Sequence, residues 1–548
     1  MRSPSQYSFA VAPSVQMPRS SFRSDRTYKT TFDAGYLIPV FHEEIYPGDS
    51  LSLNMTAFAR LTTPIVPFMD NLHMDFHFFF VPYRLLWSHW VNMNGEQTDP
   101  DDSTDYLTPV LKAPAEGSGG FAVGSLYDYF GFPVGVEGIQ PNVWLPRAYN
   151  KIWNDHFRDE NLQDSVAENT GDGPDDLTDY TLLKRGKRKD YFTAALPWPQ
   201  KGPGASVPLA GQIPVYGNGL SLGLTDGTND GALAGYNTGS AAFLNSTFPG
   251  FGGDVGDTYT VNIANAFPTK LVGVTDDPEK SGLVADLSEA SLITINTLRE
   301  AFQIQKLWEK DARGGTRYGE MVYAHFGVIN PDSRLQRSEY LGGGSIPVQI
   351  HSVAQTSSTD STTPQGNLAA YGVTSGRVGF SKSFVEHGVV LGLVSVRADL
   401  TYQQGLRRAW SRRSRFDYYW PSLAHLGEQA ILNKEIFAQG AAVKDDDGKV
   451  IDDKVFGYQE RWAELRYGHS HITGKLRSGV SGSLDVWHLA QSFSNLPQLN
   501  STFIEETPPV DRVLAVQDEP QFLFDSLATV NFVRCLPLYS VPGLVDHF

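Results

Sequence analysis

The sequence predicts a mainly β protein, with an antiparallel β core and with helices and large loops inserted between the strands. Two observations support this class. Several segments alternate apolar and polar residues, as strands with one buried face do. The 548 residues also include 52 glycines and 33 prolines, more than long helical bundles tolerate. Jelly rolls and other sandwiches are the natural candidates, and a large β fold of this kind can form one unit despite the length.

The strand pattern is clearest near the amino terminus. Residues 51–61 alternate apolar with polar side chains, and Phe58 is the exception. Residues 72–80 place Leu72, Met74, Phe76 and Phe78 on one face. In a further strand Pro39 makes a central, fully paired position unfavourable. Two more strands are expected near the carboxyl terminus, at residues 501–516 and 521–534.

Three segments have helical periodicity. Residues 147–159 form an aromatic-rich stripe. A longer helix is expected to begin at Thr297, which forms a capping box with Glu300, and to stop at Gly314 and Gly315. A third helix is expected over residues 422–431.

One long segment differs in composition from the rest of the chain. Residues 202–268 contain no Lys or Arg, and 14 glycines lie between residues 202 and 256. The Leu and Phe content favours a compact surface insertion over a linker. Residues 355–366 read as a flexible polar loop.

Charge and cysteine content exclude several function classes. The 44 Lys and Arg against 61 Asp and Glu give a net charge of -17, which argues against a surface that coats nucleic acid everywhere. Cys535 is the only cysteine, so the sequence predicts no intrachain disulfide and no Cys-based metal site, and a reducing compartment fits best. The first thirty residues lack the apolar stretch of a secretory signal, and the longest apolar run, 389–396, is too short for a membrane span. We therefore expect a soluble chain with no membrane insertion.

Patterns typical of catalysis are weak. His73, Asp75 and His77 share one strand face and could ligate a metal, but a polar strand face packed on a helix is the better interpretation because no further ligands are apparent. Residues 219–223 match G-x-S-x-G without the strand and helix that this motif requires, and residues 445–448 fit an acidic turn better than a calcium loop. We expect no enzyme activity, no metal and no cofactor.

Two basic clusters are candidate nucleic-acid sites. Arginines beside aromatic rings suit single-stranded nucleic acid, whose phosphates take the charge while its bases stack. Salt bridges within the chain or between subunits are an equally good explanation. The first cluster comprises Arg407, Arg408, Trp410, Arg412, Arg413, Arg415 and Tyr418, and the second comprises Lys184, Arg185, Lys187, Arg188 and Lys189. Residues 1–30 are also basic and could form an arm.

Long blocks of the sequence, in order from about residue 28 to residue 548, include RAYNKIWNDHFRDENL, RGKRKDYFTAALPWPQKG, YWPSLAHLGEQAILNKEIFAQG and YSVPGLVDHF. These blocks resemble the major capsid protein of the Microviridae, specifically of the gokushovirus branch, a group of small single-stranded DNA bacteriophages. Residues 202–287 and 355–376 fall outside the resemblance.

The resemblance implies an eight-stranded antiparallel jelly roll of the viral capsid type, with long inserted loops and several helices. It implies sixty copies in a T=1 icosahedral shell around circular single-stranded DNA, in a virion assembled in the host bacterial cytoplasm. A minor pilot protein, a small basic DNA-binding protein and a host surface receptor are the implied partners. The expected organisation is a basic arm (1–30), a first part of the core (31–201), a Gly-rich insertion forming a three-fold surface protrusion used for host attachment (202–287), and the remainder of the core (288–548).

A different class of function stays open on the residues alone. A β sandwich rich in Trp and Tyr could be a secreted-type carbohydrate-binding protein or a glycosidase, since a glycosidase needs only two carboxylates from different strands. The adjacent pairs Glu43–Glu44 and Glu505–Glu506 cannot themselves be such couples, because neighbours on a strand point to opposite faces.

Overall fold

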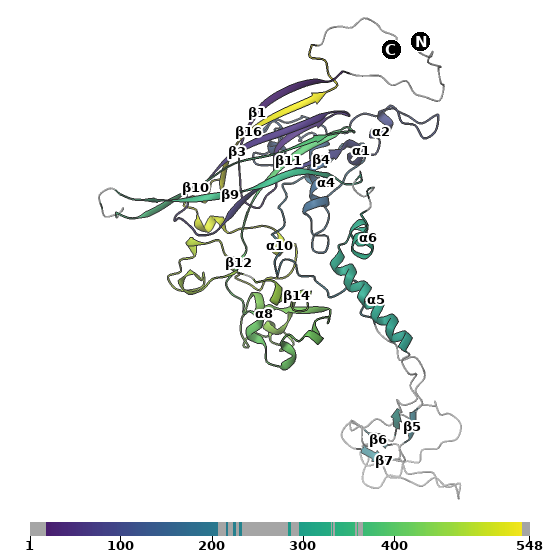
Figure 1. Ribbon diagram of the computed structural model, residues 1–548, viewed down its shortest axis with the longest axis vertical. Helices are drawn as coiled ribbons and strands as arrows, with labels where there is room; N and C mark the ends of the chain where they lie inside the picture. Colours follow the sequence, from purple (N-terminus) through teal and green to yellow (C-terminus); the bar gives the residue numbers. More distant parts are fainter. Residues whose placement is uncertain are drawn as a thin grey trace, which may run out of the picture. The chain divides into compact units, whose positions relative to one another are not determined.

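The dominant element of the structure, a computed structural model, is one antiparallel sheet of eight strands (Figure 1). Its strand order is β1-β16-β3-β10-β9-β4-β11-β2. The strands are β1 (Ser20–Phe32), β2 (Ile38–Ile45), β3 (Ser50–Leu61), β4 (Leu72–Pro82), β9 (Glu339–Ala354), β10 (Leu368–Ser383), β11 (Gly388–Ala398) and β16 (Phe522–Arg534). The structure describes residues 18–205, 215–217, 223–225, 230–232, 283–285, 295–329, 331, 335–356, 359, 365–468 and 470–539.

The strand order is that of a jelly roll. One half of the sheet contains β1, β16, β3 and β10, and the other contains β2, β11, β4 and β9, so each half interleaves early and late strands of the chain. The edge strands β1 and β2 come close to one another, and the sheet is nearly closed into a barrel. The predicted eight-stranded antiparallel jelly roll is confirmed.

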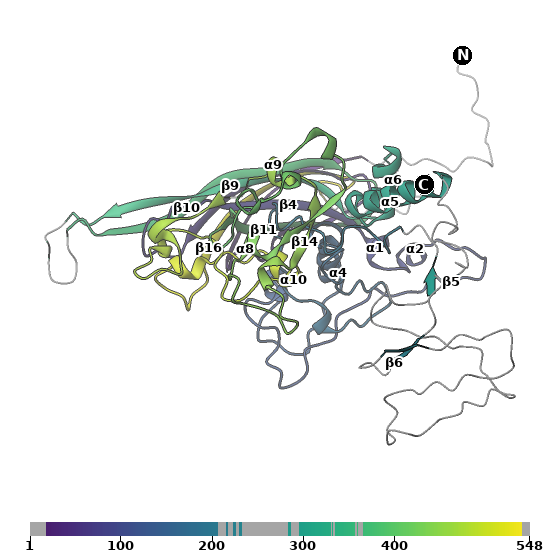
Figure 2. The same ribbon diagram turned by 90° about the horizontal axis from the view of Figure 1, so that it is seen from below.

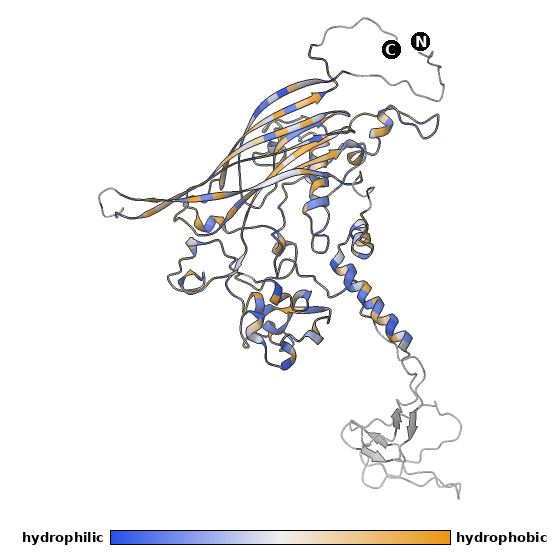
Figure 3. Cartoon of the chain, viewed as in Figure 1, coloured by the Kyte–Doolittle hydropathy of each residue, from blue (hydrophilic) through white to orange (hydrophobic). Residues whose placement is uncertain are grey.

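The alternation in β3 explains why that strand lies in the middle of its half-sheet. Every second side chain from Leu51 to Leu61 is buried, and those between them, Phe58 included, are exposed. Alternating colours along β1, β16 and β3 show the same period (Figure 3). Burying this face against the opposite half forms the main core, which includes Met55, Phe76 and Phe524. As Pro39 predicts, β2 is an edge strand.

A long hairpin joins the two halves of the sheet. The first part of β9 pairs with β4, and most of β10 pairs with β3. Only the outer parts, residues 349–354 and 368–373, pair with one another. This outer part of the hairpin runs beyond the other strands in both views (Figures 1 and 2). The polar loop predicted at residues 355–366 connects the two strands, and residues 357–358 and 360–364 of it lie outside the described residues.

Helices and inserted segments pack on the outside of the β2-β11-β4 half. The predicted aromatic helix is confirmed as α4 (Trp144–Ile152), which continues as one π-helical stretch (Trp153–Phe157), and Tyr149 and Ile152 are fully buried beside β11. Further α-helices in the described part of the chain are α1 (Tyr83–Leu86), α2 (Trp90–Met93), α3 (Leu126–Tyr129), α6 (Tyr318–Phe326), α8 (Asn433–Ile436), α9 (Ala463–Arg466) and α10 (Ser501–Ile504).

Two predicted elements are wrong. Residues 422–431 do not form a helix, because Gly427 adopts a positive φ of 78° and the chain then enters β13 (Glu428–Leu432), which pairs with β14 (Val455–Glu460). Residues 501–516 form the helix α10 and a 3₁₀ turn (Val510–Val513) instead of a strand. The Asn500 side chain accepts a hydrogen bond from the Phe503 amide and so caps α10. A minor two-stranded parallel pair is formed by β12 (Thr401–Tyr402) and β15 (Ser470–His471).

The chain divides into two units, Gly202–Trp308 and the remainder. The first contains the two-stranded pairs β5 (Val215–Gly217) with β8 (Leu283–Ala285) and β6 (Gly223–Thr225) with β7 (Asp230–Ala232), together with most of α5 (Ile295–Gly314). As predicted, α5 ends at Gly314, but it begins two residues before Thr297. The G-x-S-x-G match at residues 219–223 lies almost wholly outside the described residues.

A fully buried ion pair holds the helical layer together. Arg147 on α4 donates two hydrogen bonds of 2.7 Å to the Asp175 carboxylate, and its remaining donors reach the carbonyls of Leu86 and Gly171. Both side chains are almost completely inaccessible, at 1% and 4% exposure. One residue thereby links α4, the end of α1 and the loop before residue 175.

We predict that Arg147→Met lowers the free energy of unfolding by about 3–5 kcal/mol, because the Asp175 charge is left buried without a partner. Urea denaturation of the unassembled subunit measures this. The matched control is Lys112→Met, which breaks the exposed Lys112–Asp176 pair and should leave the free energy of unfolding nearly unchanged, because solvent screens this pair. Equal losses in the two variants would contradict this account.

Candidate nucleic-acid interface

The first basic cluster lies on an irregular segment, residues 407–420, which we call the arginine–aromatic segment. It follows β12 and contains two short 3₁₀ turns, Arg408–Ser411 and Arg415–Asp417. In a helix or strand, side chains would recur on the same face at a fixed spacing. In these irregular turns, neighbouring arginines can point in different directions. The structure accordingly divides the cluster into anchored and exposed members.

Arg408 and Arg412 anchor the segment to the protein. Arg408 Nη1 lies 2.9 Å from the Glu435 carboxylate and 2.6 Å from the Ala430 carbonyl oxygen. Arg412 Nη2 donates to Glu464 at 2.7 Å. Burial raises the pKa of Glu435, and the Arg408 charge opposes that shift. Both arginines therefore neutralise carboxylates of their own chain.

Asp417 fixes the turn between the anchored and exposed residues. Its carboxylate accepts the backbone amides of Ser414 at 2.7 Å and Arg413 at 3.0 Å. These hydrogen bonds to the charged form lower the pKa of Asp417 to about 2. The turn therefore keeps its shape throughout the neutral pH range.

The exposed members form a surface of cations and rings. The Arg413 and Arg415 side chains are exposed, and no ion pair to either is found in the described part of the chain. The Arg415 guanidinium lies 4.9 Å from the centre of the Trp420 ring. Trp410 is 75% exposed and Tyr418 is 52% exposed, and the other exposed rings are Phe416, Tyr419 and Trp420. Arg407 contacts His471 at 2.9 Å.

The second basic cluster is largely engaged within the protein. Arg185 donates to Asp75 at 2.7 Å, and Lys189 lies 2.5 Å from Asp159. Lys187 is buried and donates to the Phe503 carbonyl oxygen at 2.7 Å. Lys184 lies over the Tyr36 ring, and Arg188 is exposed and lies 4.0 Å from Asp399. The second cluster therefore offers little free charge.

The carboxylate of Asp75 is the centre of a buried ionic group. It accepts hydrogen bonds of 2.7 Å from both Arg185 and Arg397. Burial alone would raise its pKa, but a hydrogen bond from Ser345 and the two guanidinium groups outweigh burial and hold the pKa below its ordinary value. This polar strand face therefore packs against arginines that come from the loop at residue 185 and from the end of β11.

Glu506 lies close to the same group. Its backbone amide donates to the Arg185 carbonyl oxygen, and its carboxylate accepts the Ala398 amide at 3.4 Å. Burial raises the pKa of Glu506 to about 7, although Lys187, Arg185 and Arg397 act in the opposite direction.

The residues that the sequence analysis considered as metal ligands make contacts within the protein that fit a structural role. His73 lies 3.8 Å from Asp399, and His77 packs against the Phe157 ring. Asp445 pairs with Lys454 and accepts the Lys449 amide, which makes an acidic turn. Across the described ranges, no group of three or more His, Cys, Asp or Glu is arranged to hold a metal ion.

The sequence alone missed the partners that divide the first cluster. Glu435 and Glu464 lie 27 residues after Arg408 and 52 residues after Arg412. No local spacing pairs residues so far apart. The only available signal was the general excess of acidic residues.

The comparisons with known proteins identify the family. A family model described as "Capsid protein (F protein)" matches residues 10–544. The chain is 46% identical to "Capsid protein VP1" of Bdellovibrio phage phiMH2K, covering 99% of this chain and 98% of that protein. It is 44% identical to the protein of the same name from Chlamydia phage 1, covering 98% and 97%, and 36% identical to that from Spiroplasma virus 4, covering 98% and 97%.

The chain therefore belongs to this phage capsid protein family, and the resemblance to Microviridae capsid proteins is confirmed. It is a structural protein and not an enzyme, it assembles with further subunits, and it forms part of the virion. In the described part of the chain, no helix is both long enough and apolar enough to cross a membrane.

The raised pKa of Glu506 predicts how stability depends on pH. Between its ordinary pKa of 4.5 and about 7, the folded protein holds a proton that the unfolded chain releases, so this group's contribution to stability falls as pH rises. Glu506→Gln cannot titrate, so its stability relative to the natural protein should increase by about 2–3 kcal/mol between pH 4.5 and pH 8. Urea denaturation of both proteins at several pH values measures this. Parallel pH curves for the two proteins would show that Glu506 is not the responsible group.

Proposed function

We propose that sixty copies of the chain form a T=1 icosahedral shell that encloses circular single-stranded DNA, and that the arginine–aromatic segment contacts this DNA. The observation that carries the proposal is the exposed set of arginines and rings on residues 407–420. Arg413 and Arg415 have no carboxylate partner in the described part of the chain, so their charge is available to phosphates.

The chemistry of this surface suits single strands rather than duplex DNA. Exposed Trp410, Phe416 and Tyr418 offer faces on which unpaired bases stack, and stacking tolerates any base. The segment is irregular and has no long helix or two-stranded ribbon to place in a major groove. Binding through phosphate charge and stacking packages a genome without reading its sequence.

The competing explanation, salt bridges between subunits, applies differently to each arginine. Arg408 and Arg412 already have partners within the chain, so they contribute little to either DNA or a neighbouring subunit. Only substitutions of the exposed arginines can therefore distinguish DNA binding from salt bridges between subunits.

We predict that the double substitution Arg413→Ala and Arg415→Ala yields shells in normal amounts that retain less DNA. Each lost phosphate contact weakens retention and reduces its dependence on salt. The measurement is the ratio of nucleic acid to protein in purified particles at several salt concentrations.

The control for this experiment is Arg377→Ala with Arg60→Ala, which removes two exposed arginines of the sheet strands β10 and β3. A low yield of shells whose DNA content is normal would, for the Arg413 and Arg415 variant, favour a subunit interface instead.

We further propose that residues 202–287 form a surface protrusion at the three-fold axes and take part in host attachment. Their lack of Lys and Arg over residues 202–268 disfavours contact with DNA. The minor pilot protein, the small basic DNA-binding protein and a host surface receptor are the further partners we propose, with assembly in the host bacterial cytoplasm.

A reconstruction of purified particles by electron microscopy tests the assembly. We predict closed shells of sixty subunits with residues 202–287 on the outer surface. An inner position for this segment would refute the protrusion. Open assemblies, or closed shells with a different number of subunits, would contradict the T=1 shell.

A further inference from the structure

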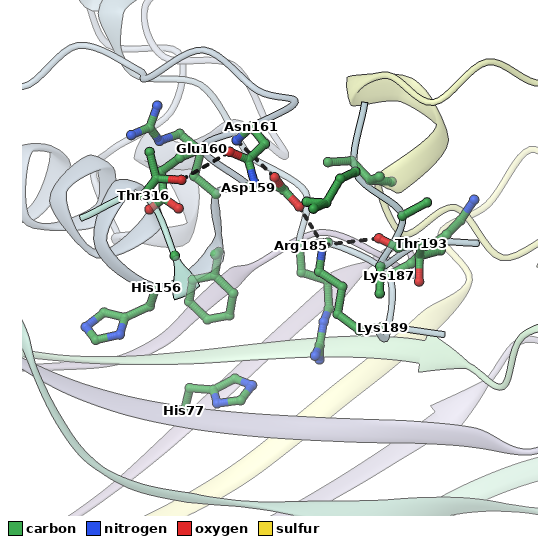
Figure 4. Close-up of a pocket in the computed structure, with 18 of the residues that line it drawn as sticks. His77, His156, Asp159, Glu160, Asn161, Arg185, Lys187, Lys189, Thr193 and Thr316 are labelled. Atoms are coloured by element: carbon green, nitrogen blue, oxygen red, sulfur yellow. Dashed lines mark hydrogen bonds and ion pairs between the residues drawn. The ribbon is translucent and has the colours of Figure 1, made fainter. Parts of the chain in front are cut away.

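The cavity beside β4 has cationic side chains that are already occupied within the protein (Figure 4). Lys189 is paired with Asp159, and Arg185 donates to Asp75. Lys187 donates to a backbone carbonyl oxygen. Open hydrogen-bonding capacity lies instead on the long hairpin formed by β9 and β10.

The outer part of this hairpin is a two-stranded ribbon, residues 349–354 of β9 with 368–373 of β10, which we call the outer ribbon. The pairing of β9 with β4 ends at Val348, and the pairing of β10 with β3 begins only at Gly372. In the described part of the chain, no further strand therefore lies along residues 349–354. The ribbon runs beyond the other strands of the sheet (Figures 1 and 2).

The alternation of hydrogen bonds shows which backbone groups face the open edge of β9. The Gln355 amide donates to the Asn367 carbonyl oxygen across the ribbon at 2.8 Å. In an antiparallel pair every second residue bonds to the partner strand, so the odd-numbered residues of β9 bond to β10 here. The backbone groups of Ile350, Ser352 and Ala354 therefore point away from β10, toward the open edge.

The outer ribbon lacks the features that usually protect an exposed strand edge. Such edges commonly carry charged side chains, proline or a bulge. Residues 349–354 and 368–373 include no Asp, Glu, Lys, Arg or Pro, and their register is unbroken. The inner parts of the same strands, by contrast, carry Glu339, Arg377 and Lys382. The open edge is therefore ready to accept another strand.

The ribbon also exposes apolar and aromatic surface. Val353 is 47% exposed and Tyr371 is 46% exposed, and the His351 ring stacks on Tyr371 with the centroids 5.1 Å apart. A two-stranded hairpin that stands alone is only marginally stable in water. Covering this surface would therefore stabilise the ribbon.

We propose that a second copy of the chain covers the outer ribbon and pairs as an added strand along Ile350, Ser352 and Ala354. Strand addition of this kind uses the open backbone groups directly. Other copies surround each subunit, because the chain assembles with further subunits. A copy with the same net charge of -17 meets no like charge on this ribbon. DNA fits poorly, because the ribbon has no Lys or Arg for phosphates.

Residue-resolved hydrogen exchange on the full chain tests the proposal without any variant. The amides of Ile350, Ser352 and Ala354 should exchange at least about tenfold more slowly in purified shells than in unassembled subunits, because the added strand protects them. Equal exchange in the two states would overturn the proposal. Slow exchange already in the unassembled subunit would also overturn it, since the chain's own residues would then cover the edge.

Empty and DNA-filled shells distinguish a second copy from the genome. A second copy protects these amides equally in both kinds of particle. Protection confined to DNA-filled particles would assign the ribbon to nucleic acid and overturn the proposal. The inference requires assembly with other copies, but neither the number of sixty nor the DNA contact of the arginine–aromatic segment, which are measured separately.

A proline variant tests the backbone pairing itself. Ser352→Pro removes one amide of the open edge and should lower the yield of shells by about tenfold or more. Ser352→Ala, the matched control, keeps that amide and should give a normal yield. Urea denaturation of unassembled Ser352→Pro should be unchanged, because residue 352 is exposed. Equal yields of shells from the two variants would exclude strand pairing at this edge.

Discussion

The buried carboxylate of Asp75 is the interaction on which the rest of this subunit depends, because it joins the sheet to the loop at residue 185. It lies on β4 and accepts one hydrogen bond from Arg185, in a loop after the helical layer, and one from Arg397, near the end of β11. A buried charge is tolerated only when it is paired and hydrogen-bonded. The pairing therefore fixes the loop at residue 185 against the sheet. It also fixes the point at which the chain leaves β11 toward the arginine–aromatic segment.

This constraint explains why a basic sequence cluster need not be a nucleic-acid site. In the second cluster Arg185 and Lys187 are held inside the protein, and Lys189 is paired with Asp159. In the first cluster the anchored arginines position the exposed ones. Arg408 pairs with the buried Glu435 and Arg412 with the partly buried Glu464, so these two contacts attach the start of the segment to the rest of the protein. The net charge of -17 therefore says little about where a phosphate could bind.

Local sequence patterns correctly predicted the strands and helices that bury one face against a single continuous core. The alternation in β3 and the aromatic stripe of α4 each face a single continuous core, so periodicity was sufficient. It failed at residues 501–516, where the Asn500 cap starts a helical turn and Pro508 and Pro509 prevent a paired strand. It failed again after Gly427, where pairing with β14 overrides the helical spacing. The arginine and aromatic content of residues 407–420 was enough to predict a candidate site. Which arginines are anchored and which are exposed depends on carboxylates distant in the sequence, and no local pattern reveals those partners.

The central claim is that the exposed residues of the arginine–aromatic segment, and not the basic residues in general, face the genome. Ultraviolet crosslinking of intact particles, followed by mass spectrometry of the crosslinked peptides, tests it most directly. The account predicts DNA adducts within residues 407–420, at Trp410 and Trp420 above all, because stacked rings crosslink readily to bases. Intact DNA-filled particles with no adduct anywhere in residues 407–420 would contradict it.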